Sequence, residues 1–156
     1  MVYDILTTIK NHLEANAQVN TVTFGDIMEV DLNKQSIFPL SHMMIDNATI
    51  SNQIATFSIS VMCMDVADVS KQDIRDEAEP FYGVGIEQDL LNTQFYVVND
   101  LVQALKRGDL FSDKYQLEGD PSCQPFMDRY ENLLVGWSVT LSISVPNTID
   151  ICQEQG

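Results

Sequence analysis

The chain has few basic residues, few cysteines and no long apolar run, and each shortage excludes a class of protein. Eight Lys and Arg stand against 23 Asp and Glu, so the net charge is −15. Nucleic acids and anionic membranes are recognised largely through Lys and Arg, so neither is an expected ligand. No apolar run approaches the roughly 18 residues that a membrane span needs. The sequence has three cysteines, and no two of them have the close spacing of a metal-binding cysteine pair. This odd number argues against a disulfide framework and for a reducing compartment.

The length and the hydrophobic content are those of one globular domain. With 156 residues, 45% of them hydrophobic, we expect a single domain over residues 1–156. The first ten residues are polar and mixed, which is not the pattern of a signal peptide. We therefore expect synthesis and retention in a cytoplasm. The acidic surplus suits a basic partner surface, or a channel wall that must not hold DNA.

Apolar residues at three- and four-residue steps predict two helices. The first covers about Val2–Leu13, with Asn16 as a stop. The second covers about Asp89–Arg107. Asp89 lies at its positive amino end, and Gly108 is placed to cap its carboxyl end. Both helices are therefore predicted to be amphipathic and to cover a core.

Alternation of apolar and polar residues predicts the strands. The strongest pattern is Leu133–Val145, apolar at every odd position, and Ile54–Met64 alternates almost as clearly. Weaker patterns predict strands over Thr21–Val30 and Ile37–Asp46. Pro39 moves the latter towards a sheet edge or a strand start.

These elements predict an α+β fold with a mostly antiparallel sheet of about four strands and two helices on one face. The expected order is helix, three strands, acidic loop, helix, strand. The acidic loop covers residues 65–88, and a segment this long without regular structure is usually functional or mobile. Residues 109–128 are expected to form a second loop, and residues 146–156 a carboxyl-terminal tail.

No catalytic constellation is present in the sequence. Nothing near His12 or His42 completes a proton relay, so each is predicted to be packed or on the surface. Cys63 follows the strand alternation and is interpreted as a small core residue, and a structural role is also favoured for Cys123. The carboxylates lack the ordered spacing of a calcium loop. We therefore predict no catalytic, cofactor-binding or metal residues, and a protein that is not an enzyme.

The even positions of the two clearest strands carry a series of Ser and Thr residues. One interpretation is an ordinary face turned to solvent. The other is a sheet face covered by a neighbouring subunit, because several uncharged hydroxyls in a row suit a closely packed polar contact. The residues leave these two interpretations open.

Several uncommon short strings follow one another in a single order over about residues 80–152. They are Pro80–Gly83, Glu87, Asn92–Gln94, Leu105–Leu110, Gly119–Phe126, Asp128–Asn132, Gly136–Trp137 and Val145–Asn147. In these strings the chain resembles the neck and tail-completion proteins of tailed phages of Bacteroidetes, including crAss-like phages. The amino-terminal half is similar only in layout.

The resemblance implies a tail-terminator fold, with an amino-terminal helix, an antiparallel sheet, a second helix and a long final strand. It also implies a virion protein, assembled in the host bacterial cytoplasm, that forms a ring of six or twelve copies. Its partners would be other copies of the chain and the portal or adjacent neck and tail ring proteins. DNA would pass through the channel without specific binding, because a wall of Asp and Glu repels phosphate. No cofactor is implied.

The acidic segment supplies the candidate contacts with a neighbouring subunit or ring, against which it is expected to become ordered. The candidate interface residues are Asp68, Asp73, Arg75, Asp76, Glu77, Phe81 and Tyr82. Two other functions fit the same charge. One is a monomeric acidic binding module, such as a DNA-mimic inhibitor of a host nucleic-acid enzyme. The other is a hydrolase, which would need a buried carboxylate pair in a cleft.

Overall fold

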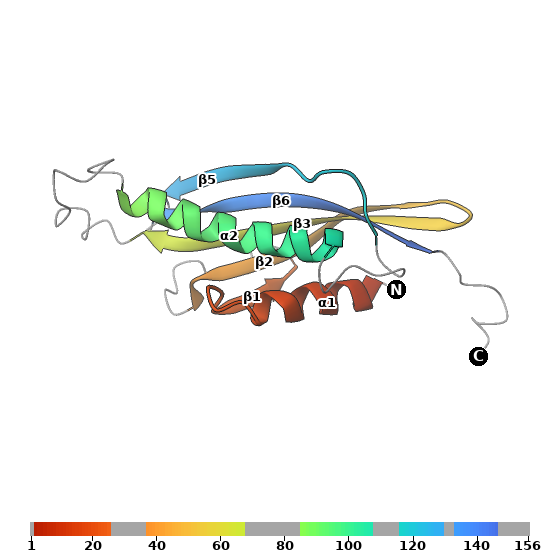
Figure 1. Ribbon diagram of the computed structural model, residues 1–156, viewed down its shortest axis with the longest axis horizontal. Helices are drawn as coiled ribbons and strands as arrows, with labels where there is room; N and C mark the ends of the chain where they lie inside the picture. Colours follow the sequence, from red (N-terminus) through yellow and green to blue (C-terminus); the bar gives the residue numbers. More distant parts are fainter. Residues whose placement is uncertain (1, 26–36, 68–84, 108–115, 130–132, 147–156) are drawn as a thin grey trace.

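Two helices lie on one face of a six-stranded, mostly antiparallel sheet in the computed structural model of the chain (Figure 1). The structure describes residues 2–25, 37–67, 85–107, 116–129 and 133–146. The α+β class, the mostly antiparallel sheet and the two helices are therefore confirmed, whereas the prediction of about four strands was wrong. The elements in chain order are α1 (Val2–Glu14), β1 (Thr21–Phe24), β2 (Leu40–Ile50), β3 (Ile54–Ala67), α2 (Gly85–Arg107), β4 (Gln116–Leu117), β5 (Cys123–Arg129) and β6 (Leu133–Pro146).

The centre of the sheet is the antiparallel pair β3 and β6. These two strands pair along their whole length, from Ile54 opposite Pro146 to Ala67 opposite Leu133. The strand order is β1-β2-β3-β6-β4, and β5 pairs with the same edge of β6 as β4 does. The pairing of β1 with β2 is parallel, and all the other pairings are antiparallel. The strand with the strongest alternation is thus a central strand.

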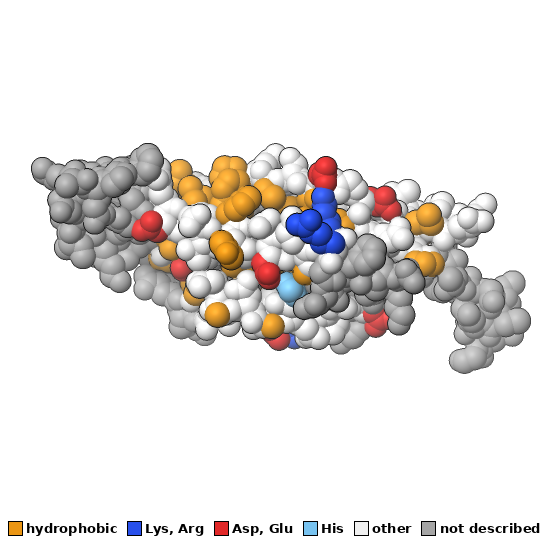
Figure 2. All heavy atoms as spheres, in the orientation of Figure 1, with side chains coloured by type: hydrophobic (Ala, Val, Ile, Leu, Met, Phe, Trp, Pro, Cys, Tyr) orange, Lys and Arg blue, Asp and Glu red, His pale blue; other side chains and the backbone are white. Residues whose placement is uncertain are grey.

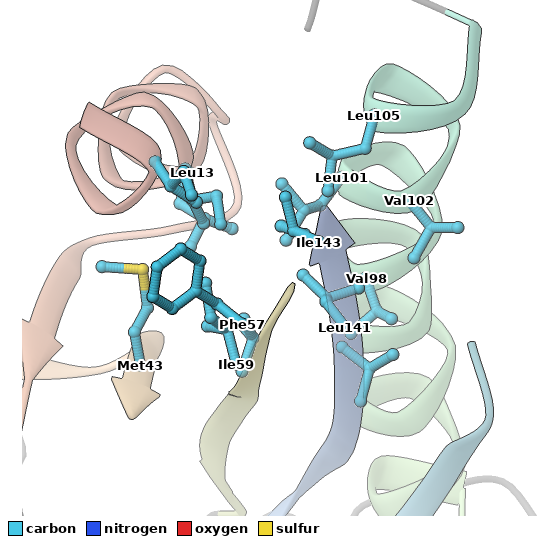
Figure 3. Close-up of a cluster of buried hydrophobic side chains, with 14 of the residues drawn as sticks. Leu13, Met43, Phe57, Ile59, Val98, Leu101, Val102, Leu105, Leu141 and Ile143 are labelled. Carbon is cyan, nitrogen blue, oxygen red and sulfur yellow. The ribbon is translucent and has the colours of Figure 1, made fainter. Parts of the chain in front are cut away.

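The main core lies between the helices and the odd-numbered side chains of β3 and β6. Because successive side chains of a strand point to opposite faces, the alternation places one whole apolar set on the same side. Figure 3 shows how α1 and α2 meet the sheet there. Its members include Ile9, Leu13, Met43, Phe57, Ile59, Val98, Leu101, Leu105, Leu141 and Ile143. Each such side chain stabilises the fold by roughly 1.5–3 kcal/mol when it is fully buried.

The helices follow the periodic pattern closely at three of their four ends. α1 ends at Glu14, and in the turn that follows the side-chain oxygen of Asn16 accepts the Gln18 backbone N–H at 2.8 Å. The exception is the start of α2, which begins at Gly85 and not at Asp89. Leu90 and Leu91 pack against Val135 of β6, and this contact anchors the first turns of the helix to the sheet.

Two strands occupy the segment that was predicted to be a loop over residues 109–128. β5 pairs residue by residue with Leu133–Val139 of β6, and β4 pairs with Ser144 and Ile143. The prediction was wrong because β5 contains Pro125 and lacks clean alternation. Its strand conformation depends on the free edge of β6, to which it pairs over its whole length.

The remaining strand boundaries also differ from the predicted ones. β2 begins at Leu40, directly after Pro39, and continues to Ile50 because it pairs with β3 as far as Ala55. β1 ends at Phe24, and Gly25 follows with a φ of 113°, a conformation that favours glycine. The rest of the predicted first strand, residues 26–30, lies outside the described residues.

Both ends of the acidic loop predicted over residues 65–88 belong to regular elements. Residues 65–67 are part of β3, and residues 85–88 are part of α2. The rest of the predicted loop, residues 68–84, lies outside the described residues. At the other end of the chain, Pro146 closes β6, so it belongs to the strand and not to the predicted tail. Residues 147–156 lie outside the described residues.

The backbone of β3 lies close to Gly136 of β6. A Cβ atom at this position would lie 2.1 Å from the carbonyl oxygen of Cys63 and 2.8 Å from the Cα of Met64. Both of these are backbone atoms, which cannot move aside without shifting β3. Only a residue without a side chain therefore fits here.

We predict that Gly136→Ala lowers the free energy of unfolding by about 3 kcal/mol, because overpacking against backbone costs roughly 1–3 kcal/mol and occasionally more. Urea unfolding followed by circular dichroism measures the change. Ser138→Ala is the matched control, two residues along the same face of β6, with an expected change within about 0.5 kcal/mol. Equal midpoints for Gly136→Ala and the unmodified chain would contradict the close approach.

Candidate functional site

The sheet face opposite the helices carries rows of hydroxyl side chains. They come from the even positions of β3 and β6, where directly opposed residues share a face. They are Thr56, Ser58, Ser60, Ser138, Thr140, Ser142 and Ser144. We call this set the hydroxyl face. Neither of the two described helices covers it, since both pack on the other side of the sheet.

Hydrogen bonds across the strands order the hydroxyl face. Thr56 Oγ1 lies 3.2 Å from Ser144 Oγ, and Ser60 Oγ lies 3.4 Å from Thr140 Oγ1. Ser60 also donates to Asp46 Oδ2 of β2 at 2.5 Å. These bonds engage four of the seven hydroxyls, and Ser60 and Ser144 are buried although neither described helix covers their face. The result is a neutral, ordered polar surface.

Carboxylates border the hydroxyl face on both sides. Asp46 lies on the β2 side, and Glu118 and Asp120 lie on the β4–β5 side. A hollow of about 250 Å³ on the latter side is lined by Glu118, Asp120, Pro121, Ser122, Gln124, Ser138, Thr140 and Ser142. The hollow thus presents hydroxyl, amide and carboxylate groups, and no Lys or Arg is among its lining residues.

Asp120 is held at the rim of this hollow by an ion pair. Its Oδ1 accepts a hydrogen bond from Lys106 Nζ at the end of α2. This bond and the positive charge of Lys106 lower the pKa of the Asp120 carboxyl from its ordinary value. Asp120 therefore carries its negative charge near neutral pH.

The hydroxyl face gives way to an apolar cluster at one end. Leu40, Met64 and Leu134 are buried there, and partly buried apolar neighbours pack on them, among them Phe38 and Phe126. The polar area is therefore confined to the middle of the sheet and the end nearer to the β2–β3 hairpin.

Both histidines are packed or at the surface, as predicted, although a carboxylate does lie beside His12. His12 Nε2 lies 2.8 Å from Asp100 Oδ2, so it joins α1 to α2. His42 is fully buried. Its two ring nitrogens each lie 2.7 Å from an oxygen, Thr23 Oγ1 and the Gly25 carbonyl oxygen, so it holds β1 against β2.

The two described cysteines are also packing residues. Cys63 is buried in the main core, and burial raises the pKa of its thiol to about 11. Cys123 lies in β5 and not in a loop, half-buried against the same core, and burial raises its pKa too. Since a thiolate is the reactive form of cysteine, neither thiol is activated as a nucleophile. Within the described ranges, no three His, Cys, Asp or Glu residues gather as a metal site.

The structure leaves the predicted subunit contacts untested. Asp68, Asp73, Arg75, Asp76, Glu77, Phe81 and Tyr82 all lie outside the described residues. The structure adds two site residues, Glu118 and Asp120, which lie in the connection between β4 and β5, within the segment predicted to be a loop. Strand pairing over distant sequence positions brings them beside β6, and no local pattern signals that. No helix in the described part of the chain is long and apolar enough to cross a membrane.

No protein-family model and no curated protein sequence matches the chain.

The raised pKa of Cys63 predicts a pH dependence of stability. Burial raises the pKa of this thiol from its ordinary 9.0 to about 11, so its contribution is complete below pH 9 and is lost as the pH rises towards 11. Between about pH 8 and about pH 10, the unmodified chain should lose about 1 kcal/mol more unfolding free energy than Cys63→Ala. Urea unfolding at the two pH values measures this. Parallel losses in both proteins would show that Cys63 is not desolvated.

Proposed function

We propose that the protein is a structural ring protein of the head-to-tail connector or tail-completion region of a tailed phage. In this proposal, six or twelve copies surround the DNA channel and join portal-side to tail-side components of the virion. The protein is not an enzyme and holds no cofactor. The observation that supports this most directly is the hydroxyl face, a long neutral surface bordered by carboxylates in a chain of net charge −15.

A DNA channel must let the duplex slide without holding it. Proteins hold DNA mainly by neutralising phosphates with Lys and Arg, which releases bound counterions. The seven residues of the hydroxyl face carry no charge, and its described borders carry Asp46, Glu118 and Asp120, the last of which is paired with Lys106. The face itself therefore offers phosphate no positive charge, and DNA gains nothing from counterion release there. We therefore place the hydroxyl face towards the channel.

The order of elements also supports the proposal. The chain resembles tail-terminator proteins in its short strings, and that resemblance implies an amino-terminal helix, an antiparallel sheet, a second helix and a long final strand. The described chain has α1, an antiparallel centre, α2 and the long strand β6 in this order. Because one fold can serve many functions, this agreement supports the proposal less strongly than the uncharged hydroxyl face does.

The proposed partners are other copies of the chain, together with the portal or the adjacent neck and tail rings. The acidic segment that contains Asp73, Asp76 and Glu77 remains a predicted contact with them. Purified protein should form closed rings of six or twelve copies, seen by native mass spectrometry and negative-stain microscopy, and virions should contain the chain. A chain that is monomeric at every concentration and missing from virions would contradict the proposal. Tight binding of such a monomer to a host nucleic-acid enzyme would favour the acidic binding module.

Adding positive charge to the hydroxyl face should convert a passive channel into a DNA-binding one. We predict that rings carrying Thr140→Lys and Ser142→Lys bind duplex DNA at low salt, and that the binding falls by a factor of about 10³ or more between roughly 50 and 200 mM salt. Fluorescence anisotropy with labelled DNA measures it, and unmodified rings should not bind.

The matched control places the same charges on the outer side of α2, as Asn92→Lys and Asn99→Lys, where both residues are exposed. These rings have the same net charge, but their added lysines face away from the channel. Binding that is equal in both lysine variants would show that the hydroxyl face does not line the channel.

A further inference from the structure

Helix α2 buries an uncharged polar side chain on the side that faces the core. Gln94 is 1% exposed, and it lies one helical turn from Leu91 and one turn from Val98, so it shares their face of the helix. Within the described residues, neither its amide nitrogen nor its amide oxygen has a hydrogen-bond partner. An amide that leaves water without gaining a partner is unfavourable. Gln94 therefore weakens the packing of this part of α2 on the sheet.

The two halves of α2 are docked unequally. We call residues 85–96 its amino-terminal half and residues 97–107 its carboxyl-terminal half. The carboxyl-terminal half places five buried side chains in the main core, namely Val97, Val98, Leu101, Val102 and Leu105.

Hydrogen bonds to other elements also hold the carboxyl-terminal half. Asp100 pairs with His12 of α1, and Lys106 pairs with Asp120 in the connection between β4 and β5. This half is therefore fixed both on its apolar face and through polar side chains.

The amino-terminal half has a small apolar contact of its own. Leu90 and Leu91 are only partly buried, and they pack on Val135 in a cluster separate from the main core. Phe95 and Tyr96, which follow Gln94, are 41% and 72% exposed. Figure 2 shows hydrophobic side chains at the surface over this half, and Lys and Arg side chains at the other end of the helix. The amino-terminal half therefore gains much less from burial than the carboxyl-terminal half.

Trp137 of β6 holds the amino-terminal half to the sheet. Its Nε1 donates a hydrogen bond to the Leu91 carbonyl oxygen at 2.8 Å, and its ring meets that of Phe95 edge to face with centroids 5.2 Å apart. One hydrogen bond and one aromatic pair stabilise by about as much as one buried, unpaired amide destabilises. The Trp137 contacts and the Gln94 amide therefore nearly cancel. The partial burial of Leu90 and Leu91 is what keeps this half docked.

We propose that the amino-terminal half of α2 is a hinged flap, which opens from the sheet as one unit while the carboxyl-terminal half stays docked. Opening hydrates the Gln94 amide, breaks the Trp137 contacts and uncovers Val135 at one end of β6. Because closing regains few buried contacts, the flap opens at a much lower free energy than the whole domain unfolds. The inference rests on contacts within one copy of the chain, so it stands or falls independently of the proposed ring function.

Residue-resolved hydrogen exchange tests whether this half opens as a unit. The first four N–H groups of a helix lack an intrahelical partner, so the informative amides are those of residues 89–96 and 98–105. Mass spectrometry with electron-transfer fragmentation measures them in the full chain, whether or not it is assembled. We expect residues 89–96 to share one protection factor, at least about 100-fold below that of residues 98–105, because they open together.

Two results of this measurement overturn the flap. One is equal protection in both halves, which would mean that α2 opens only when the domain unfolds. The other is protection that rises residue by residue from Asp89 onwards, because such a gradient is the ordinary fraying of a helix end.

Removal of the buried amide tests the part that Gln94 plays. Gln94→Leu keeps a side chain of similar size without the unpaired polar atoms, so exchange over residues 89–96 should slow by at least about tenfold. The slowing should include residues 89–91, which precede Gln94, because opening as a unit moves Gln94 each time. Gln88→Leu is the matched control, since it removes an exposed amide from the same half of the helix, and its rates should stay within about threefold. Equal effects of the two replacements overturn the proposal.

A change at Trp137 tests the contact that holds the flap closed. Trp137→Phe keeps an aromatic ring beside Phe95 and removes the N–H donor to Leu91, so residues 89–96 should exchange about fivefold faster. Unchanged exchange over these residues would show that Trp137 does not hold this half, and it would overturn the flap as described.

Discussion

The full-length pairing of β3 with β6, with one apolar face under two helices, is the constraint on which the rest of the structure depends. It buries the odd-numbered side chains of both strands against α1 and α2. Because a strand has a period of two, the same pairing must present the even-numbered hydroxyls on the opposite face. It also offers the free edge of β6 to β4 and β5, and the edge of β3 to β2. At Gly136 the backbone of β3 leaves no room for a side chain.

The hydroxyl face follows from this arrangement. It is neutral and bordered by carboxylates, which suits a wall beside a polyanion.

Much of the fold could be predicted from local patterns, and the errors share one cause. The carboxyl end of α1, the start of β3 and the bounds of β6 were predicted to within about two residues because their periodicity is strong. β5 was missed because Cys123–Arg129 has a proline and no alternation, and it becomes a strand only by pairing with β6. The limits of β2 and the first turns of α2 likewise depend on partners far along the chain, namely β3 and Val135.

The candidate site divides in the same way between local and long-range determinants. The sequence by itself determined that Ser and Thr share one side of the two longest strands, that Cys63 belongs to the other side, and that the chain is acidic, because face membership and charge are properties of neighbouring residues. Only the tertiary structure decided that no described helix covers the hydroxyl side, that Asp46, Glu118 and Asp120 border it, and that Phe95 packs on Trp137. The physical reason is that hydrogen bonds between strands distant in sequence set these neighbours, and no local pattern contains that pairing.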